Sequence, residues 1–306
     1  MTSAPEDPMQ KDSKNSYDTV KIVSWNVNGL QGILKKDALG TPSTITQLRK
    51  AEKPSALRSM ITAELPDILC LQEIRCSEAF DHTIHFPEYS HQFANWCTRR
   101  KGYSGTMVLS KITPEVVHYN FEEFAETPSD PYIVDEGRVL TLYFREFVLV
   151  NVYVPNSGVD GLARLKYRTE TWEPLMRRYL SSLIEKYHNV VIIGDFNVIS
   201  ESHDVNLHSD ILSDDTTFAG ATPSERHEWR RLLELGLHDT YRIHTPLTTL
   251  AITWYCKNSY NRAVRGCRLD YALVTDKLRS RVISSTILAQ YPGSDHYPIH
   301  LTLSNR

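Results

Sequence analysis

The sequence lacks the features of membrane, secreted and zinc-binding proteins. No stretch approaches the roughly 20 apolar residues needed to cross a bilayer, and the first 19 residues contain no apolar segment of a secretory signal. The cysteines are odd in number and form no CxxC pair and no Cys/His cluster with zinc spacing. We therefore expect reduced thiols in an intracellular protein, nuclear in a eukaryote or cytoplasmic in a prokaryote. The five cysteines are Cys70, Cys76, Cys97, Cys256 and Cys267.

An excess of positive charge is also missing. The formal net charge is −3, so the overall electrostatics give no argument for binding nucleic acid, and any polyanion must be met locally. Short basic runs are usually solvated surface, but neighbouring aromatic residues favour binding because stacking and phosphate contact can be combined. The local candidates are Lys35 with Lys36, the run Arg99, Arg100 and Lys101 beside Trp96 and Tyr103, and Arg262, Arg265 and Arg268 beside Tyr260.

No Gly/Ser linker or break in composition divides the chain. Residues 1–19 carry too few apolar side chains to offset the entropy of ordering, which predicts a flexible polar tail followed by one domain over residues 20–306. Short apolar runs recur through that domain and are typical of buried strands. The predicted strands cover residues 20–27, 67–73, 105–110, 138–144, 147–154, 189–196, 269–275 and 297–303.

Three helical patterns lie between these strands. Residues 54–65 carry an apolar face and stop at Pro66, residues 162–187 carry a longer one with a restart or kink at Pro174, and a capping box starts a helix at Thr222. Strand pairs with short turns alternate with helix-connected strands. The pattern predicts an α/β (α+β) fold in four layers, with two mixed sheets packed face to face and helices outside.

Residues 190–197, VVIIGDFN, carry the most information. Four β-branched residues ending at Gly194 predict a buried strand, and Asp195 and Asn197, two apart, would project to the same side. Asp and Asn also commonly close a loop after a strand, so this motif alone leaves turn chemistry and function equally open. Residues 31–53 and 200–220 follow similar strand ends and are expected to be surface loops where ligands bind.

Other strands end in groups that suit phosphate chemistry. These groups are Asn26, Asn28, Glu73, Tyr153, Asn156, Asp270, Asp295 and His296. Each alone could be a cap or a satisfied core residue, but their joint occurrence at equivalent strand ends favours a site. Glu73 ends a strand that is expected to be buried, and burying its carboxylate costs free energy unless the carboxylate is paired or binds a metal. Oxygen ligands without cysteine suit Mg²⁺ or Mn²⁺ better than Zn²⁺.

Nine short motifs follow one another from Lys21 to about Leu303: WNVNGL, DILCLQE, KGYSG, GRV, VYVPN, GDFNV, TPSER, RLDY and GSDHYPI. In these motifs and their order the sequence resembles the exonuclease III type apurinic/apyrimidinic endonucleases of the endonuclease/exonuclease/phosphatase superfamily. GDFN and SDH are shared across the superfamily. LQE, KGYSG, YVPN and RLDY are narrower and point to the DNA repair branch.

The resemblance implies a role for each matching residue. It implies metal ligation by Glu73, with Asn28 nearby and Asp295 as a further ligand, for Mg²⁺ with Mn²⁺ as a substitute. Asp195 would orient or deprotonate the attacking water, and Asp270 would support a phosphate-binding His296. The implied contacts to the scissile phosphate are Asn26, Asn197 and Tyr153, with Asn156 in the same pocket. Further implied substrate contacts are Lys36, Arg75, Gly102, Tyr103, Trp254, Cys267 and Leu269.

The chain departs from the family at the expected pocket for the abasic sugar. Family members carry Trp or another large apolar residue before the Arg of RLDY, where this chain has Cys267. Thr253, Trp254 and Tyr255 stand where Phe and Trp are usual, unless a gap brings Trp254 and Tyr255 into place. Because such enzymes select substrates by pocket shape, the departure bears on specificity.

The resemblance implies a Mg²⁺-dependent monomeric nuclease that cuts duplex DNA 5′ to abasic sites, with possible 3′-5′ exonuclease and 3′-phosphodiesterase activity. Alternatives are the same chemistry on another substrate, as in a retroelement-type endonuclease, a phosphotyrosyl-DNA phosphodiesterase, an RNA deadenylase or an inositol phosphate phosphatase. A noncatalytic DNA-binding protein on the same fold is a third hypothesis. It predicts the loss of at least one key polar residue, and none is missing.

Overall fold

A computed structural model of the protein describes residues 18–34, 55–77, 85–121, 135–158, 160–206, 209–256 and 266–305. Most of the expected N-terminal tail lies outside these residues, as do Lys35, Lys36, Tyr260, Arg262 and Arg265. All five cysteines are free thiols, as expected. Within the described ranges, no helix combines the length and the apolar character that a bilayer span requires.

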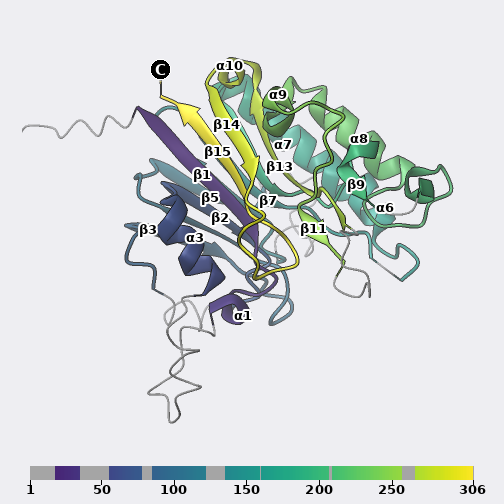
Figure 1. The fold of residues 1–306 in the computed structure, drawn as a ribbon, viewed down its shortest axis with the longest axis horizontal. Helices are drawn as coiled ribbons and strands as arrows, with labels where there is room; N and C mark the ends of the chain where they lie inside the picture. Colours follow the sequence, from purple (N-terminus) through teal and green to yellow (C-terminus); the bar gives the residue numbers. More distant parts are fainter. Residues whose placement is uncertain are drawn as a thin grey trace, which may run out of the picture.

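Two six-stranded mixed sheets form the centre of the fold (Figure 1). The first has the order β14-β15-β1-β2-β4-β3 and the second β10-β13-β8-β7-β6-β5. The strands of the first are β1 (Thr19–Asn26), β2 (Ile68–Gln72), β3 (His91–Asn95), β4 (Thr106–Ser110), β14 (Val282–Ile287) and β15 (Ile299–Ser304). Those of the second are β5 (Val116–Tyr119), β6 (Val139–Tyr143), β7 (Val148–Tyr153), β8 (Val190–Asp195), β10 (Leu237–Asp239) and β13 (Asp270–Thr275).

The two sheets face each other across a continuous apolar cluster. Side chains of the first sheet, such as Ile22 and Ile68, meet side chains of the second, such as Leu149 and Ile193, and all four are fully buried. The opposite faces of the central strands are apolar too, which is why these strands read as unbroken hydrophobic runs.

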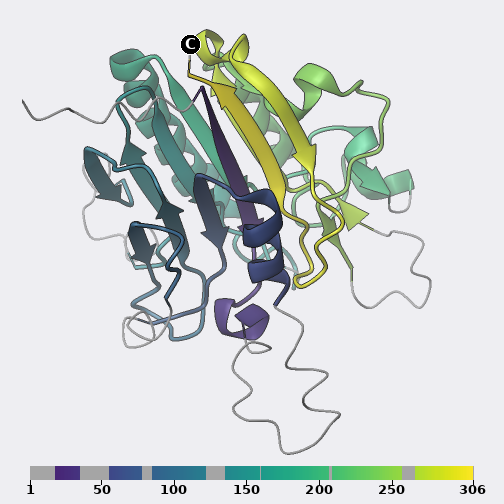
Figure 2. The ribbon, with the colours of Figure 1, turned by 60° about the vertical axis from the view of Figure 1, so that its left-hand side comes forward.

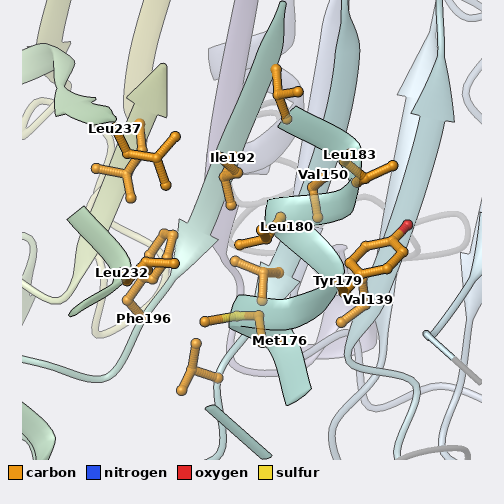
Figure 3. Close-up of a cluster of buried hydrophobic side chains, with 14 of the residues drawn as sticks. Val139, Val150, Met176, Tyr179, Leu180, Leu183, Ile192, Phe196, Leu232 and Leu237 are labelled. Atoms are coloured by element: carbon orange, nitrogen blue, oxygen red, sulfur yellow. The ribbon is translucent and has the colours of Figure 1, made fainter. Parts of the chain in front are cut away.

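Helices cover the two outer faces (Figure 2). The helices α1 (Leu30–Leu34) and α3 (Ala56–Glu64) pack on the first sheet, while α7 (Glu173–Tyr187) and α8 (Pro223–Leu233) pack on the second. Figure 3 shows Met176, Leu180 and Leu183 of α7 lying on Val150 and Ile192 of β7 and β8. The predicted four layers are confirmed.

Short elements complete the described fold. They are α6 (Leu165–Tyr167), the π-helix η2 (Arg168–Trp172), α9 (Thr240–His244), α10 (Asp276–Arg279), the 3₁₀ helices η3 (Ser202–Asp204) and η4 (Ser209–Leu212), and a small sheet of β9 (Val205–Asn206), β11 (Trp254–Tyr255) and β12 (Gly266–Cys267). The sequence predicts a surface loop over residues 31–53, but residues 31–34 belong to the helix α1. Leu30 and Ile33 of this helix are buried against the first sheet.

The helix predicted over residues 162–187 is interrupted where the sequence indicated. The π-helix η2 ends just before Pro174, with the Glu173 N–H bonded to the Arg168 carbonyl. Proline has no N–H to donate to the preceding turn, so the chain widens there before α7 continues. The capping box at Thr222 is present as predicted, with both of its reciprocal hydrogen bonds to Glu225.

Candidate active site

The predicted strand-end residues meet at one edge of the two sheets. The strands β1 and β2 are parallel, as are β7 and β8, so their carboxyl ends point the same way. In Figure 1, β1 (purple) runs from near the C-terminus down toward α1 and β11. The antiparallel β13 starts at this edge, where Asp270 is registered opposite Asp195, and Asp195 in turn lies beside Tyr153.

The backbone at this edge is strained at several site residues. Asn28, Glu73, Arg75 and Asn197 all have positive φ, between 48° and 51°, a left-handed conformation that non-glycine residues rarely adopt. Such strain persists only where the surrounding structure fixes it, and it gathers at functional sites. Gly194 is needed for a different reason, since a Cβ there would lie 2.0 Å from the Val152 carbonyl oxygen.

Asp195 is buried and held by amides. Its Oδ2 accepts from Asn26 Nδ2 at 2.9 Å, and its Oδ1 accepts from the Asn197 backbone N–H at 2.9 Å. Burial and the neighbouring Asp270 carboxylate raise the pKa of Asp195 to about 7. A carboxylate of this kind can orient a water molecule and accept its proton near neutral pH.

Asn26 connects Asp195 to a second carboxylate, Glu73. The Asn26 Nδ2 also donates to Glu73 Oε1 at 3.3 Å, Tyr153 donates its hydroxyl proton to the same oxygen at 2.6 Å, and Arg75 pairs with Glu73 Oε2 at 2.5 Å. Burial would raise the pKa of Glu73, but the Tyr153 hydrogen bond and the Arg75 charge outweigh it and lower this pKa. Burial and Glu73 keep the pKa of Tyr153 far above its usual value, so the phenol remains a donor.

His296 and Asp270 form a buried pair, with Nδ1 and Oδ2 2.8 Å apart. Burial alone would lower the pKa of His296, but the Asp270 carboxylate outweighs it and raises the pKa to about 10. His296 is therefore cationic at neutral pH and suited to a phosphate oxygen. The Trp25 indole N–H donates to the His296 backbone carbonyl at 2.9 Å, so β1 helps to position the segment that carries His296.

A cavity of about 450 Å³ opens above these groups. One wall is polar and the other carries Phe218, Trp254 and Leu269. The lining residues are Asn28, Glu73, Arg75, Tyr153, Asn156, Asp195, Asn197, Thr217, Phe218, Ala219, Trp254, Leu269, Asp295 and His296. Asn26 and Asp270 lie buried behind the lining and support it.

The donor set fits a hard divalent cation. Glu73 is ionised, and Asn28 Nδ2 donates to Asp295 Oδ1 at 2.6 Å, which brings these two predicted ligands together on the same cavity. Among the described residues, Asp195, Asp270 and His296 also place their ligand atoms within 4.8 Å of one another, and Asp270 Oδ1 is buried with no hydrogen-bond partner. Oxygen-rich sites without thiolates suit Mg²⁺ or Mn²⁺.

Some predicted contacts lie elsewhere. Tyr103 follows the predicted basic run Arg99, Arg100 and Lys101, and it lines a separate depression of about 570 Å³ with Arg100 and Arg164. Gly102 (φ +71°) precedes it. Lys36 lies outside the described residues. Arg268 is buried and paired with Asp204 and Asp239, so it does not belong to a basic surface as the sequence suggested.

The structure also corrects the placement of Cys267. Its thiol is fully buried and does not line the cavity. Cys267 pairs with Trp254 across β11 and β12, and it packs into a small cluster with Ile199 and Ala221. Trp254 occupies the wall instead, as the sequence alternative with a gap allowed.

Sequence reasoning missed two supporting residues. Arg168 is fully buried and donates to the carbonyls of Phe196 at 3.0 Å and Asn197 at 2.7 Å, so it holds the segment that carries the site. Thr253 Oγ1 accepts the backbone N–H groups of Leu269 at 2.9 Å and Asp270 at 3.1 Å. Neither residue has a local pattern that signals these long-range contacts.

Comparisons with known proteins agree with this geometry. A model of the endonuclease/exonuclease/phosphatase family matches residues 23–296. The chain belongs to this family. It is 35% identical to DNA repair nuclease APEX1 of Danio rerio over 98% of this chain and 86% of the relative. It is 32% identical to an exodeoxyribonuclease of Bacillus subtilis over 93% of this chain and all of the relative.

The solved structures give the same fold. The AP endonuclease LMAP of Leishmania major superposes with a TM-score of 0.76 at 29% identity, over 94% of this chain and 88% of that one. The predicted resemblance to exonuclease III type enzymes and the predicted hydrolase class are confirmed by these relatives of the endonuclease/exonuclease/phosphatase family.

Proposed function

We propose that this family member hydrolyses the phosphodiester 5′ to abasic sites in duplex DNA, leaving a 3′-hydroxyl, and that it uses Mg²⁺. The observation that carries the proposal is the meeting of Asp195 and the His296–Asp270 pair on one cavity that also has an apolar wall. The names of the relatives, a DNA repair nuclease and an exodeoxyribonuclease, support the choice of DNA.

The residues divide the reaction between them. Asp195, fixed by Asn26 and Asn197, orients the attacking water and accepts its proton. Cationic His296 faces the phosphate, where negative charge spreads over the nonbridging oxygens in the transition state. Tyr153 lines the same cavity, and its hydroxyl can turn from Glu73, to which it donates, toward a phosphate oxygen. Preorganised donors aimed at that charge supply a large part of catalysis because they need no rearrangement during the reaction.

We propose that Glu73, Asn28 and Asp295 hold the metal. When bound, Mg²⁺ supplies Lewis-acid stabilisation of the phosphate charge. Arg75 pairs with Glu73 and, being partly exposed, can leave that carboxylate for a DNA phosphate. We further propose that residues 20–306 act as one catalytic domain in a monomer; sedimentation of the pure protein tests the oligomeric state.

One incubation tests substrate and cofactor together. A labelled duplex with a central tetrahydrofuran abasic analogue and a matched undamaged duplex are each incubated with Mg²⁺ or with EDTA. We expect a single cut 5′ to the analogue in Mg²⁺ only. Equal cutting of both duplexes refutes the repair function, and cutting in EDTA refutes the metal requirement.

Two variants test the assigned roles. Asp195→Asn and His296→Asn should each lower turnover by about 10²- to 10⁴-fold, at a temperature where circular dichroism shows that each variant is folded. The matched control is Asp276→Asn, because Asp276 is an exposed carboxylate that pairs with His238 on the surface. Near-normal turnover in either site variant would contradict the mechanism.

A further inference from the structure

The apolar wall of the cavity comes from three different segments. Leu269 precedes β13, Trp254 lies on β11, and Phe218 lies in the stretch between η4 and α8. All three pack on the small cluster that buries Ile199 and Cys267. The wall therefore faces the catalytic groups on one side and rests on a fixed apolar base on the other.

The segment that carries Phe218 is tied to the catalytic strand. The Gly220 carbonyl accepts from the Ile199 N–H at 2.8 Å, and a Cβ on Gly220 would lie 2.9 Å from the Asn197 carbonyl oxygen. The Phe218 N–H donates to Thr216 Oγ1 at 3.2 Å, and its carbonyl accepts from the Ala221 N–H at 3.0 Å. Phe218 thus keeps a set position relative to Asn197.

The residue expected to supply this wall cannot do so. Cys267 has no exposed surface, is paired with Trp254 across β11 and β12, and belongs to the buried cluster. Phe218 is only partly buried and reaches the cavity itself. A large apolar side chain is thus present at the cavity, but it arrives from the segment after η4 and not from the start of β13.

We propose that Phe218 is the specificity-determining residue that, with Trp254 and Leu269, receives the base-free deoxyribose. This inference rests on the proposed function, since it assigns one wall of the same cavity. A sugar without its base presents an apolar C–H face that gains from leaving water. A nucleotide that keeps its base needs additional room on the side that Phe218 fills. Phe218 therefore favours the abasic residue by contacting its sugar and by occupying room that a base would need.

The test compares the binding of two duplexes, without catalysis. Fluorescence anisotropy in EDTA gives the Kd for a tetrahydrofuran duplex and for its undamaged match, with the wild type and with Phe218→Ala, Phe218→Leu and Leu212→Ala. Leu212 is the matched control because it packs on the same cluster but does not line the cavity. The kcat/KM on the abasic duplex is measured in Mg²⁺ alongside.

The preference is the ratio of the Kd for the undamaged duplex to the Kd for the abasic duplex. We expect this ratio to fall about tenfold in Phe218→Ala, because the variant binds the abasic duplex more weakly and the undamaged duplex equally or more tightly. Phe218→Leu should keep most of the preference and Leu212→Ala all of it. An unchanged preference in Phe218→Ala overturns the inference, as does an equal loss in Leu212→Ala. A wild type that shows no abasic preference overturns the proposed function instead. If Phe218→Ala unfolds, Phe218→Leu decides: a partial loss of the preference that Leu212→Ala does not share supports the inference, and a preference equal to that of the wild type overturns it.

Discussion

Replacing Arg168 should damage both the stability and the activity of the enzyme. Its guanidinium is fully buried and makes four hydrogen bonds between 2.7 and 3.0 Å. Two go to the carboxylates of Glu173 and Glu225, and two go to the carbonyls of Phe196 and Asn197. The side chain thus joins the π-helix η2, the starts of α7 and α8, and the segment that bears Asn197.

The magnitude follows from what the change leaves behind. In Arg168→Met, two buried carboxylates lose a positive partner and two buried carbonyls lose a donor. Breaking a buried ion pair by removing one partner costs about 3–5 kcal/mol. Glu225 keeps some support, because Ser157, Gly220 and Thr222 also donate to it. We therefore expect a loss of about 4 kcal/mol in the free energy of unfolding.

Urea unfolding, followed by tryptophan fluorescence, measures this loss. The matched variant Arg168→Lys keeps the charge, but one ammonium group cannot reach four acceptors in the directions that a guanidinium serves. We expect it to fold with an intermediate loss and, at a temperature where it is fully folded, to show a lower kcat with little change in KM. A loss below about 1 kcal/mol in Arg168→Met, the cost of an ordinary neutral hydrogen bond, would refute the reasoning.

Three further predictions test other parts of the site. Thr253→Val leaves two buried backbone N–H groups at the start of β13 without their acceptor, which should cost about 2 kcal/mol in urea unfolding; unchanged stability would contradict the positioning role. Burial raises the pKa of Glu173 to about 7, so between the unfolded value near 4.5 and pH 7 the folded state binds the extra proton. Wild-type stability should therefore fall relative to Glu173→Gln as the pH rises from 5 to 8, and a constant difference in unfolding free energy would rule this out. Mg²⁺ at 100 times its Kd should stabilise the wild type by about 2.7 kcal/mol in thermal unfolding; equal stabilisation of Glu73→Gln would remove Glu73 as a ligand.

The central strands could be predicted because each is buried on both faces. Their apolar runs, such as residues 189–196, have a cause that is local to the strand. The strands that sequence reasoning missed are edges or very short elements. HQFAN in β3 and VISSTI in β14 are half-buried edge strands with mixed side chains. Their pairing depends on β4 and β15, and edge strands carry little signal of their own.

The side chains that we propose as catalytic lie in short sequence motifs, while the residues that hold them do not. Asp195 and His296 lie in motifs whose chemistry is visible at short spacing. The role of Thr253 depends on where β13 begins, 16 residues away in sequence for the first bond. Phe218 lies in a polar stretch that predicts only a loop, and its proposed role depends on the cavity that it lines in the folded protein. Such contacts are products of the fold.

The strained backbone at the candidate site is held in place by neighbouring side chains. Positive φ at Asn28, Glu73 and Asn197 would relax if the neighbouring segments could move. Arg168 prevents this at Asn197, because the guanidinium that binds the two carbonyls is itself held by the buried carboxylates of Glu173 in α7 and Glu225 in α8. We expect the fixed position of Asn197 to lower the barrier to phosphate hydrolysis, because preorganised groups need no rearrangement during the reaction. Loss of Arg168 should therefore act on turnover through geometry, even where folding survives.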